Sequence, residues 1–193
     1  MKEVLIPFSQ ELLRAISFAL YKHSNQRRKA RDASFVPYMV HPIETVSILV
    51  DAGICDLITL QVAILHDVLE DTECTEEELS MMFGNEVRVL VGALTNTPGI
   101  SGDEKRKYQI SCMQRADCRA RMVKIADKTS NLRDLVRCPP GWKTTSVVAY
   151  TTSAYQVMKA ADHGDIPEPL LRSFWQAYAG LQEWINERKE TTL

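Results

Sequence analysis

Residues 58–71 read ITLQVAILHDVLED, and this segment governs both the fold and the chemistry of the chain. Its first eight residues are mostly apolar without the alternation of a strand, which predicts a buried helix that begins near Asp56. On such a helix both His66 and Asp67 share a face with Ala63. The apolar face that must point into the core therefore ends in ionisable side chains.

These ionisable side chains need compensation if the helix is buried. An isolated charge inside a protein costs several kcal/mol, and a divalent cation bound by the adjacent pair His66 and Asp67 would offset that cost. Glu70 and Asp71 follow one turn later, and each taken alone is more typical of a helix end that meets solvent. The pair His66 and Asp67 thus favours a metal site. Glu70 and Asp71 could be either solvated or catalytic.

Two side chains outside this segment are candidates for the same metal. His41 precedes a proline at the predicted start of a helix, and Asp127 lies in the apolar helical segment VKIADK, residues 123–128. Each has a simpler alternative. A lone histidine is more often structural, and Asp127 could instead form a salt bridge with Lys124 or Lys128.

The other two histidines, His23 and His163, lie in polar segments and are predicted to face solvent. Two imidazoles and two carboxylates form a mixed nitrogen and oxygen set, which suits manganese, iron or zinc better than calcium. Such a metal activates water and stabilises developing phosphoryl charge, and Glu70 and Asp71 are placed to position that water or take its proton. The predicted metal ligands are His41, His66, Asp67 and Asp127.

Helical periodicity recurs along the rest of the chain, and no convincing strand pattern interrupts it. The expected helices cover about 9–24, 42–52, 56–71, a helix opened by a capping box at Thr75, 87–94, 104–115, 118–136, 144–162 and 167–188. Gly84 is expected to interrupt the helical segment that begins at Thr75, and residues 95–103 form the clearest loop. We therefore predict an all-α protein with a single domain over 1–193, a motif-bearing core over about 20–160 and a C-terminal packing helix.

The composition is typical of a globular protein. The chain has 193 residues, of which 45% are hydrophobic and 25% charged, and its net charge of −2 gives no global attraction to nucleic acid or membranes. No segment approaches the roughly 20 apolar residues needed to span a bilayer, and the N-terminus lacks a signal-peptide pattern. The five cysteines form no CxxC pair. We expect a cytoplasmic protein with free thiols.

Two basic runs could meet an anionic ligand. The first is QRRK at residues 26–29, with Lys22 nearby, and the second is KRK at residues 105–107. Both are also typical of solvated surface. The first lies just upstream of His41, where the planar guanidinium groups of arginine could hold phosphate oxygens.

Three motifs, in this order and at these separations, resemble the HD-domain hydrolases of the RelA/SpoT group. They are VHP at residues 40–42, ILHDVLEDT at 64–72, and ADKTSNLRDL at 126–135. The likeness runs from about Arg27 to Tyr155 and is greatest to the single-domain alarmone hydrolases, metazoan SpoT homologues among them. It implies an all-α HD-domain phosphohydrolase fold without synthetase or regulatory domains.

The resemblance implies manganese-dependent removal of the 3′-pyrophosphate of guanosine tetra- or pentaphosphate, a small-molecule nucleotide substrate. It assigns metal binding to His41, His66, Asp67 and Asp127 and catalysis to Glu70 and Asp71. Contacts with the nucleotide are assigned to Arg28, Lys29, Asn131 and Tyr150.

The chain departs from the family pattern in places that would meet the nucleotide. Asn96 stands where the family usually has aspartate, and Pro98 and Gly102 replace loop lysines. Ser146 and Ala149 replace an arginine and a glutamate on the late helix. These changes leave two alternatives open: a phosphatase for another nucleotide such as NADPH, and an alarmone-binding domain without activity. The C-terminal aromatic helix is expected to pack in the core rather than form a dimer face, and the oligomeric state stays open.

Overall fold

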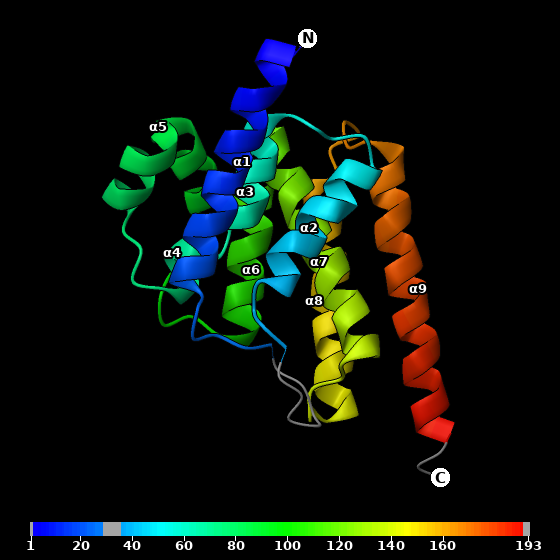
Figure 1. Cartoon of the computed structure of the whole chain (residues 1–193). Coiled ribbons are helices and arrows are strands. Elements are labelled where there is room, and N and C mark those ends of the chain that lie inside the picture. The colour runs from blue at the N-terminus through cyan, green and yellow to red at the C-terminus, as the bar shows by residue number, and fades with distance from the viewer. Residues whose placement is uncertain (1, 29–35, 191–193) are drawn as a thin grey trace.

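The computed structural model describes residues 2–28 and 36–190, and all of its regular elements are helices (Figure 1). The helices are α1 (Lys2–Lys22), α2 (Val40–Asp51), α3 (Leu57–Leu65), α4 (Val68–Asp71), α5 (Glu76–Leu94), α6 (Gly102–Met113), α7 (Cys118–Arg137), α8 (Thr144–Ala161) and α9 (Glu168–Glu190). Within the described residues the β pairing is limited to an isolated bridge between Arg27 and Pro37. The predicted all-α class is confirmed.

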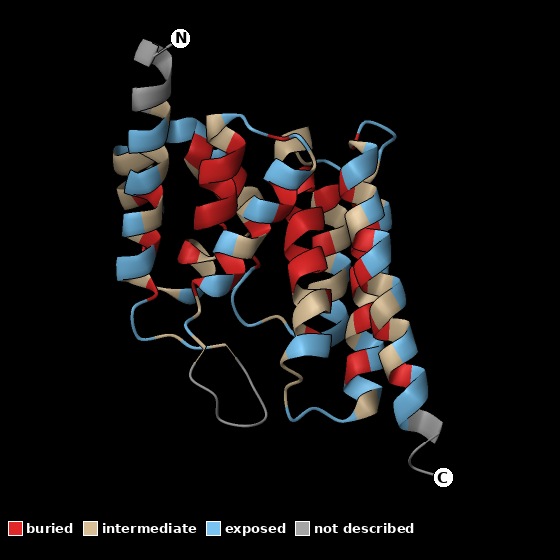
Figure 2. Cartoon of the chain, turned by 45° about the vertical axis from the view of Figure 1, so that its right-hand side comes forward, coloured by how far each residue is buried: buried red, intermediate tan, exposed pale blue. Residues whose placement is uncertain are grey.

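The helix α7 lies at the centre of the molecule and packs against α2, α8 and α9, while α1 packs on α3 (Figure 1). Every residue of α7 from 120 to 130 is buried, including charged ones. A helix buried on all sides must find partners for its polar groups inside the protein. The outer helices instead have one buried and one exposed face, as Figure 2 shows.

The helix expected over 56–71 breaks at the point where its charges begin. Its start is as predicted, because the carboxylate of Asp56 caps α3 by accepting from the amide of Thr59 at 2.9 Å. The helix then ends at Leu65, since Nδ1 of His66 donates to the carbonyl oxygen of Ala63 at 2.8 Å. A continuing helix would use that carbonyl for the amide four residues later. His66 and Asp67 therefore occupy a corner between α3 and α4.

Other boundaries differ by smaller amounts. The first helix begins at Lys2 rather than near residue 9, and α6 begins at Gly102 rather than 104. The capping box is present, since the Thr75 hydroxyl accepts from the amide of Glu78. Gly84, with a φ of 87°, kinks α5 as expected, because that left-handed backbone favours glycine.

The C-terminal helix packs into the core, as predicted. Its inward residues Leu170, Phe174, Leu181 and Ile185 are buried and belong to the same hydrophobic cluster as the interior of α3 and α7. Among the described residues, no helix combines the length and the apolar character that crossing a membrane requires.

Candidate metal centre and surrounding cavity

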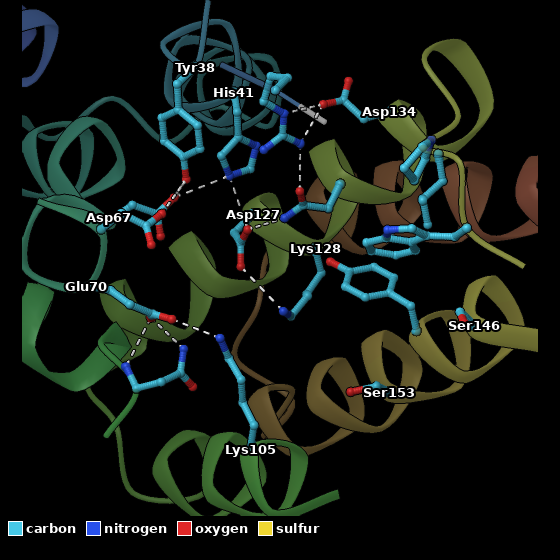
Figure 3. A pocket seen from close by; sticks show the side chains of 18 of the residues that line it. Tyr38, His41, Asp67, Glu70, Lys105, Asp127, Lys128, Asp134, Ser146 and Ser153 are labelled. Carbon is cyan, nitrogen blue, oxygen red and sulfur yellow. Dashed lines mark hydrogen bonds and ion pairs between the residues drawn. The ribbon is translucent and has the colours of Figure 1, made fainter. Parts of the chain in front are cut away.

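Four side chains predicted as metal ligands come together from three places in the fold, and Figure 3 shows His41, Asp67 and Asp127 among them. His41 lies in the first turn of α2, His66 and Asp67 at the corner between α3 and α4, and Asp127 in the middle of α7. The side chains of His41, His66 and Asp127 are buried, and each offers a ligand atom within 4.8 Å of the others. Asp67 brings its Oδ2 to 3.0 Å from Nε2 of His66.

Hydrogen bonds behind the two imidazoles fix which nitrogen faces the centre. The Ser130 hydroxyl donates to Glu44 at 2.9 Å, so it must accept from Nδ1 of His41, also at 2.9 Å. In His66, Nδ1 donates to the carbonyl of Ala63. Both Nε2 atoms therefore turn toward each other, 3.3 Å apart, with lone pairs rather than hydrogens in the neutral form.

This arrangement fits a divalent cation. Oδ1 of Asp127 lies 3.3 Å from Nε2 of His41, so the centre gathers two imidazole lone pairs and carboxylate oxygens that repel one another. Only a positive charge between them relieves that repulsion, whether from a proton or a metal ion. Imidazole nitrogens fixed through Nδ1 by backbone or side-chain oxygens are the usual arrangement around protein-bound metals.

The pKa values of the centre follow from its neighbours. Burial lowers the pKa of His41, which favours the neutral imidazole that a metal requires. Burial also acts to lower the pKa of His66, but Asp67 outweighs it and the pKa is raised. Burial alone would raise the pKa of Asp127, yet Lys128 and Lys124 hold it well below the usual range.

Asp127 is tied to its own helix by several contacts. Its Oδ2 lies 3.4 Å from Nζ of Lys124 and 3.7 Å from Nζ of Lys128, and both lysines are buried. Its Oδ1 accepts from Nδ2 of Asn131 at 2.5 Å. The salt bridges that were the simpler alternative to a metal are therefore present, but they coexist with the ligand geometry because they occupy the other carboxylate oxygen.

Tyr38 links one predicted ligand to one predicted catalytic acid. Its hydroxyl bonds Oδ2 of Asp67 and lies 3.1 Å from Oδ2 of Asp71. Burial and the negative charge of Asp67 raise the pKa of Asp71. The ring of His23 stacks on Tyr38 with the ring centres 4.7 Å apart. The prediction that His23 faces solvent is wrong, because this stacking and a 2.7 Å bond from its Nδ1 to Gln26 bury it.

Glu70 is held on the opposite side by different partners. Its Oε2 accepts from the backbone amide of Asn96 at 3.1 Å and from the Asn96 side chain at 2.6 Å. Its Oε1 accepts from Nζ of Lys105 at 2.8 Å, and Gln109 donates to Oδ1 of Asn96 at 3.0 Å. Burial would raise the pKa of Glu70, but Lys105 and Asn96 lower it.

A cavity of about 1000 Å³ opens beside these groups. Arg28, Asn131 and Tyr150, three of the predicted nucleotide contacts, line it, whereas Lys29 lies outside the described residues. Arg28 donates to Oδ2 of Asp134 at 2.5 and 2.9 Å and to Oδ1 of Asn131 at 2.8 Å. Lys22 takes no part, because it pairs with Glu78 at 2.6 Å and does not line the cavity.

Several residues of this region were not predicted from the sequence as part of the site. Trp142 lines the cavity with its ring 6.1 Å from that of Tyr150, and Lys128 lies 5.6 Å from the centre of the Tyr150 ring. Tyr38 and Ser130 act through contacts with segments far away in the chain. Only the tyrosine so close to His41 and the serine one helical turn from Asp127 could have suggested a role.

Comparison with known proteins supports a common origin with one group of hydrolases. The sequence matches the HD domain family over residues 15–164. It is 43% identical over 151 residues to the guanosine-3′,5′-bis(diphosphate) 3′-pyrophosphohydrolase MESH1 of Mus musculus, covering 77% of this chain and 83% of that protein. The protein of the same name from Homo sapiens gives the same identity and coverage. The one from Drosophila melanogaster is 40% identical over 136 residues, covering 69% of this chain and 75% of that protein.

The fold agrees with these relatives. A solved structure described as a metazoan orthologue of SpoT that hydrolyses ppGpp matches this one with a TM-score of 0.81 at 32% sequence identity. The match covers 88% of this chain and 94% of that structure.

Proposed function

Because the chain belongs to the HD domain family, we propose that it removes the 3′-pyrophosphate of guanosine tetra- and pentaphosphate, leaving GDP or GTP and pyrophosphate. The observation that carries this proposal is the buried cluster of two imidazoles and carboxylates beside a pair of acids, at the wall of a cavity lined with arginine and lysine. The enzyme is a phosphohydrolase with a small-molecule nucleotide substrate.

The centre holds a divalent cation, and we assign its ligands to His41, His66, Asp67 and Asp127, with manganese as the metal. When bound, the metal supplies Lewis acidity, which acidifies water and offsets phosphoryl charge. Nitrogen and oxygen ligands in this mixture suit manganese and leave room for substrate.

The two acids have different surroundings and so receive different roles in this proposal. Two donors of Asn96 fix Oε2 of Glu70, which suits its other oxygen, Oε1, to orient the attacking water. Asp71 accepts from Tyr38 only at 3.1 Å, and its raised pKa brings it closer to the range of an effective proton acceptor. Asp71 therefore takes the proton in our scheme.

The nucleotide lies along the cavity with its phosphates toward the cations and its base toward the aromatic end. Arg28 and Asn131 are adjacent to the metal ligand Asp127, which suits them to phosphate and ribose oxygens. Trp142 and Tyr150 offer aromatic faces for a base at the far end. Lys29 joins this set as a prediction from the family resemblance.

A second substrate deserves the same assay because of the α8 wall. Ser146, Ala149 and Ser153 line this side of the cavity without charge, as Figure 3 shows for the two serines. Without charged side chains, this wall selects less strongly among the bases and phosphate groups that can lie against it. The same centre could then act on the 2′-phosphate of NADPH.

The test is to incubate the purified protein with guanosine tetraphosphate and manganese, and in parallel with NADPH, and to follow release of pyrophosphate and phosphate. We expect pyrophosphate release that is lost on chelation and in Asp67→Ala. A folded, metal-loaded wild type that releases no pyrophosphate would overturn the alarmone assignment, and phosphate release from NADPH alone would favour the second substrate.

We also propose that the chain forms a single domain and works in the cytoplasm. The described helices share one hydrophobic cluster, which supports a single hydrolase domain over 1–193. All five cysteines are free, as expected for a protein that works in the reducing cytoplasm.

A further inference from the structure

The basic run at residues 105–107 is not used by the proposed reaction, yet part of it enters the cavity. Lys105 and Arg106 line the cavity, while Lys107, on the same helix α6, is exposed and does not. Figure 3 shows Lys105 reaching from its helix toward Glu70 and the space beside Asp127. The loop before α6, from Thr95 to Ser101, contains no lysine or arginine.

Glu70 keeps its position without help from Lys105. Its Oε2 is fixed by two donors of Asn96, and Gln109 fixes Asn96 in turn. Both amide side chains are buried. The ammonium of Lys105 therefore binds a carboxylate that other groups already hold, and it can leave without displacing Glu70.

The bond between Lys105 and Glu70 is also easily exchanged. The Lys105 side chain is 40% exposed and that of Glu70 is 23% exposed, and ion pairs open to solvent contribute little to stability. A pyrophosphate group carries more negative charge than one carboxylate and presents several acceptor oxygens. It competes well for an ammonium at the end of a flexible side chain.

Four other cations at the cavity lie against acids that do not belong to the predicted catalytic pair. Arg28 is bound to Asp134, Lys124 and Lys128 lie against Asp127, and Arg106 lies 3.1 Å from Asp103. Lys105 differs because its partner Glu70 belongs to α4, which begins directly after Asp67. Its ammonium thus lies at the metal end of the cavity, away from the aromatic end.

We propose that Lys105 binds the pyrophosphate group that leaves the substrate, and that it exchanges Glu70 for a phosphate oxygen when the substrate enters. This inference rests on the proposed function for the identity of the group, while the contact itself rests on the position of Lys105. The exchange frees Oε1 of Glu70 only in the complex with substrate, so water is oriented when there is a phosphoryl group to attack.

The experiment compares Lys105→Ala and Lys105→Arg with Lys107→Ala, a lysine of the same run that points away from the cavity. The manganese-loaded proteins are assayed for KM and kcat with guanosine tetraphosphate and for inhibition by inorganic pyrophosphate. We expect Lys105→Ala to raise both KM and the inhibition constant by about tenfold, the usual effect of one charge-assisted hydrogen bond. Lys107→Ala should change either by less than about twofold, and Lys105→Arg should restore most of the affinity.

The pyrophosphate measurement separates binding from positioning. If Lys105→Ala lowers kcat but leaves pyrophosphate inhibition unchanged, Lys105 only positions Glu70 and the inference is wrong. If the wild type does not turn over the tetraphosphate, the proposed function fails, and calorimetric titration of the manganese-loaded proteins with pyrophosphate still decides whether Lys105 binds it. Equal affinity of the wild type and Lys105→Ala in that titration would overturn the inference.

Discussion

Asp127 should stabilise the fold even when no metal is present, and Asp127→Asn tests this. The carboxylate is buried between Lys124 and Lys128, which are themselves buried, with Oδ2 within 3.4 and 3.7 Å of their nitrogens. The neutral amide of asparagine has nearly the same shape but cannot offset two ammonium charges. The substitution therefore leaves buried positive charge without a counterion.

The size of the effect follows from the partners that remain. Removing one member of a buried ion pair costs about 3–5 kcal/mol. Lys124 keeps a bond to the carbonyl of Leu94 at 3.4 Å, and Lys128 keeps the face of Tyr150 at 5.6 Å. We therefore expect the lower end, a loss of about 3 kcal/mol in the free energy of unfolding, which for a chain of this size lowers Tm by about 6–12 °C.

The assay is thermal unfolding in chelator at neutral pH, with Asp51→Asn as the control. Asp51 is an exposed aspartate at the end of α2, and its substitution should change stability by less than about 0.5 kcal/mol. The pH dependence has a defined sign. Because the pKa of Asp127 is lowered in the folded protein, its contribution is fully present above the ordinary aspartate pKa of about 4 and is lost as pH falls through the lowered value.

The difference in Tm between the wild type and Asp127→Asn should therefore disappear only in strong acid. An Asp127→Asn protein that unfolds within 2 °C of the wild type at pH 7, near the effect expected for a surface change, would refute this account of the buried lysines.

Three further predictions concern the centre and its surroundings. Tyr38→Phe removes the donor shared by Asp67 and Asp71 and should lower kcat about tenfold or more, with little change in KM; an unchanged kcat would show that the hydroxyl is dispensable. Burial raises the pKa of Cys74 to about 11, so iodoacetamide at pH 8 should label it at least about 100-fold more slowly than the exposed Cys55, as followed by mass spectrometry; similar labelling rates would contradict the assigned burial. Manganese at 100 times its dissociation constant should stabilise the wild type by about 2.7 kcal/mol in thermal unfolding, and an unchanged Tm on adding the metal would argue against a metal centre.

The helices were largely predictable from the sequence because their signals are local. Thr75 and Asp56 cap their helices as side-chain patterns predict, and Gly84 kinks α5 where glycine interrupts the periodicity. The break after Leu65 was not predictable from periodicity. It depends on the His66 imidazole competing for a backbone carbonyl, a choice that follows from the tertiary position of the ring.

The candidate site was predictable where a charged residue interrupts an apolar segment. His66 and Asp127 stand out in this way, and the structure brings both close to His41. The role of Asp67 as a fourth ligand stays a prediction. Tyr38 and Ser130 gave only the weak signal of lying near His41 and Asp127 in the sequence, because each acquires its role from a partner more than 25 positions away.

The neighbouring helices α7 and α8 differ in how freely their residues can be substituted. On α7 the residues from 120 to 130 are buried, so a change of Asp127 disturbs both the interior and the proposed metal centre. On α8 the cavity-facing Ser146 and Ala149 are exposed, and a different side chain there would find room in solvent. Over evolutionary time such a protein can vary its choice of substrate through α8 while the hydrolytic step is preserved by α7. Selectivity in a lineage of these enzymes is thus free to drift long before catalysis is lost.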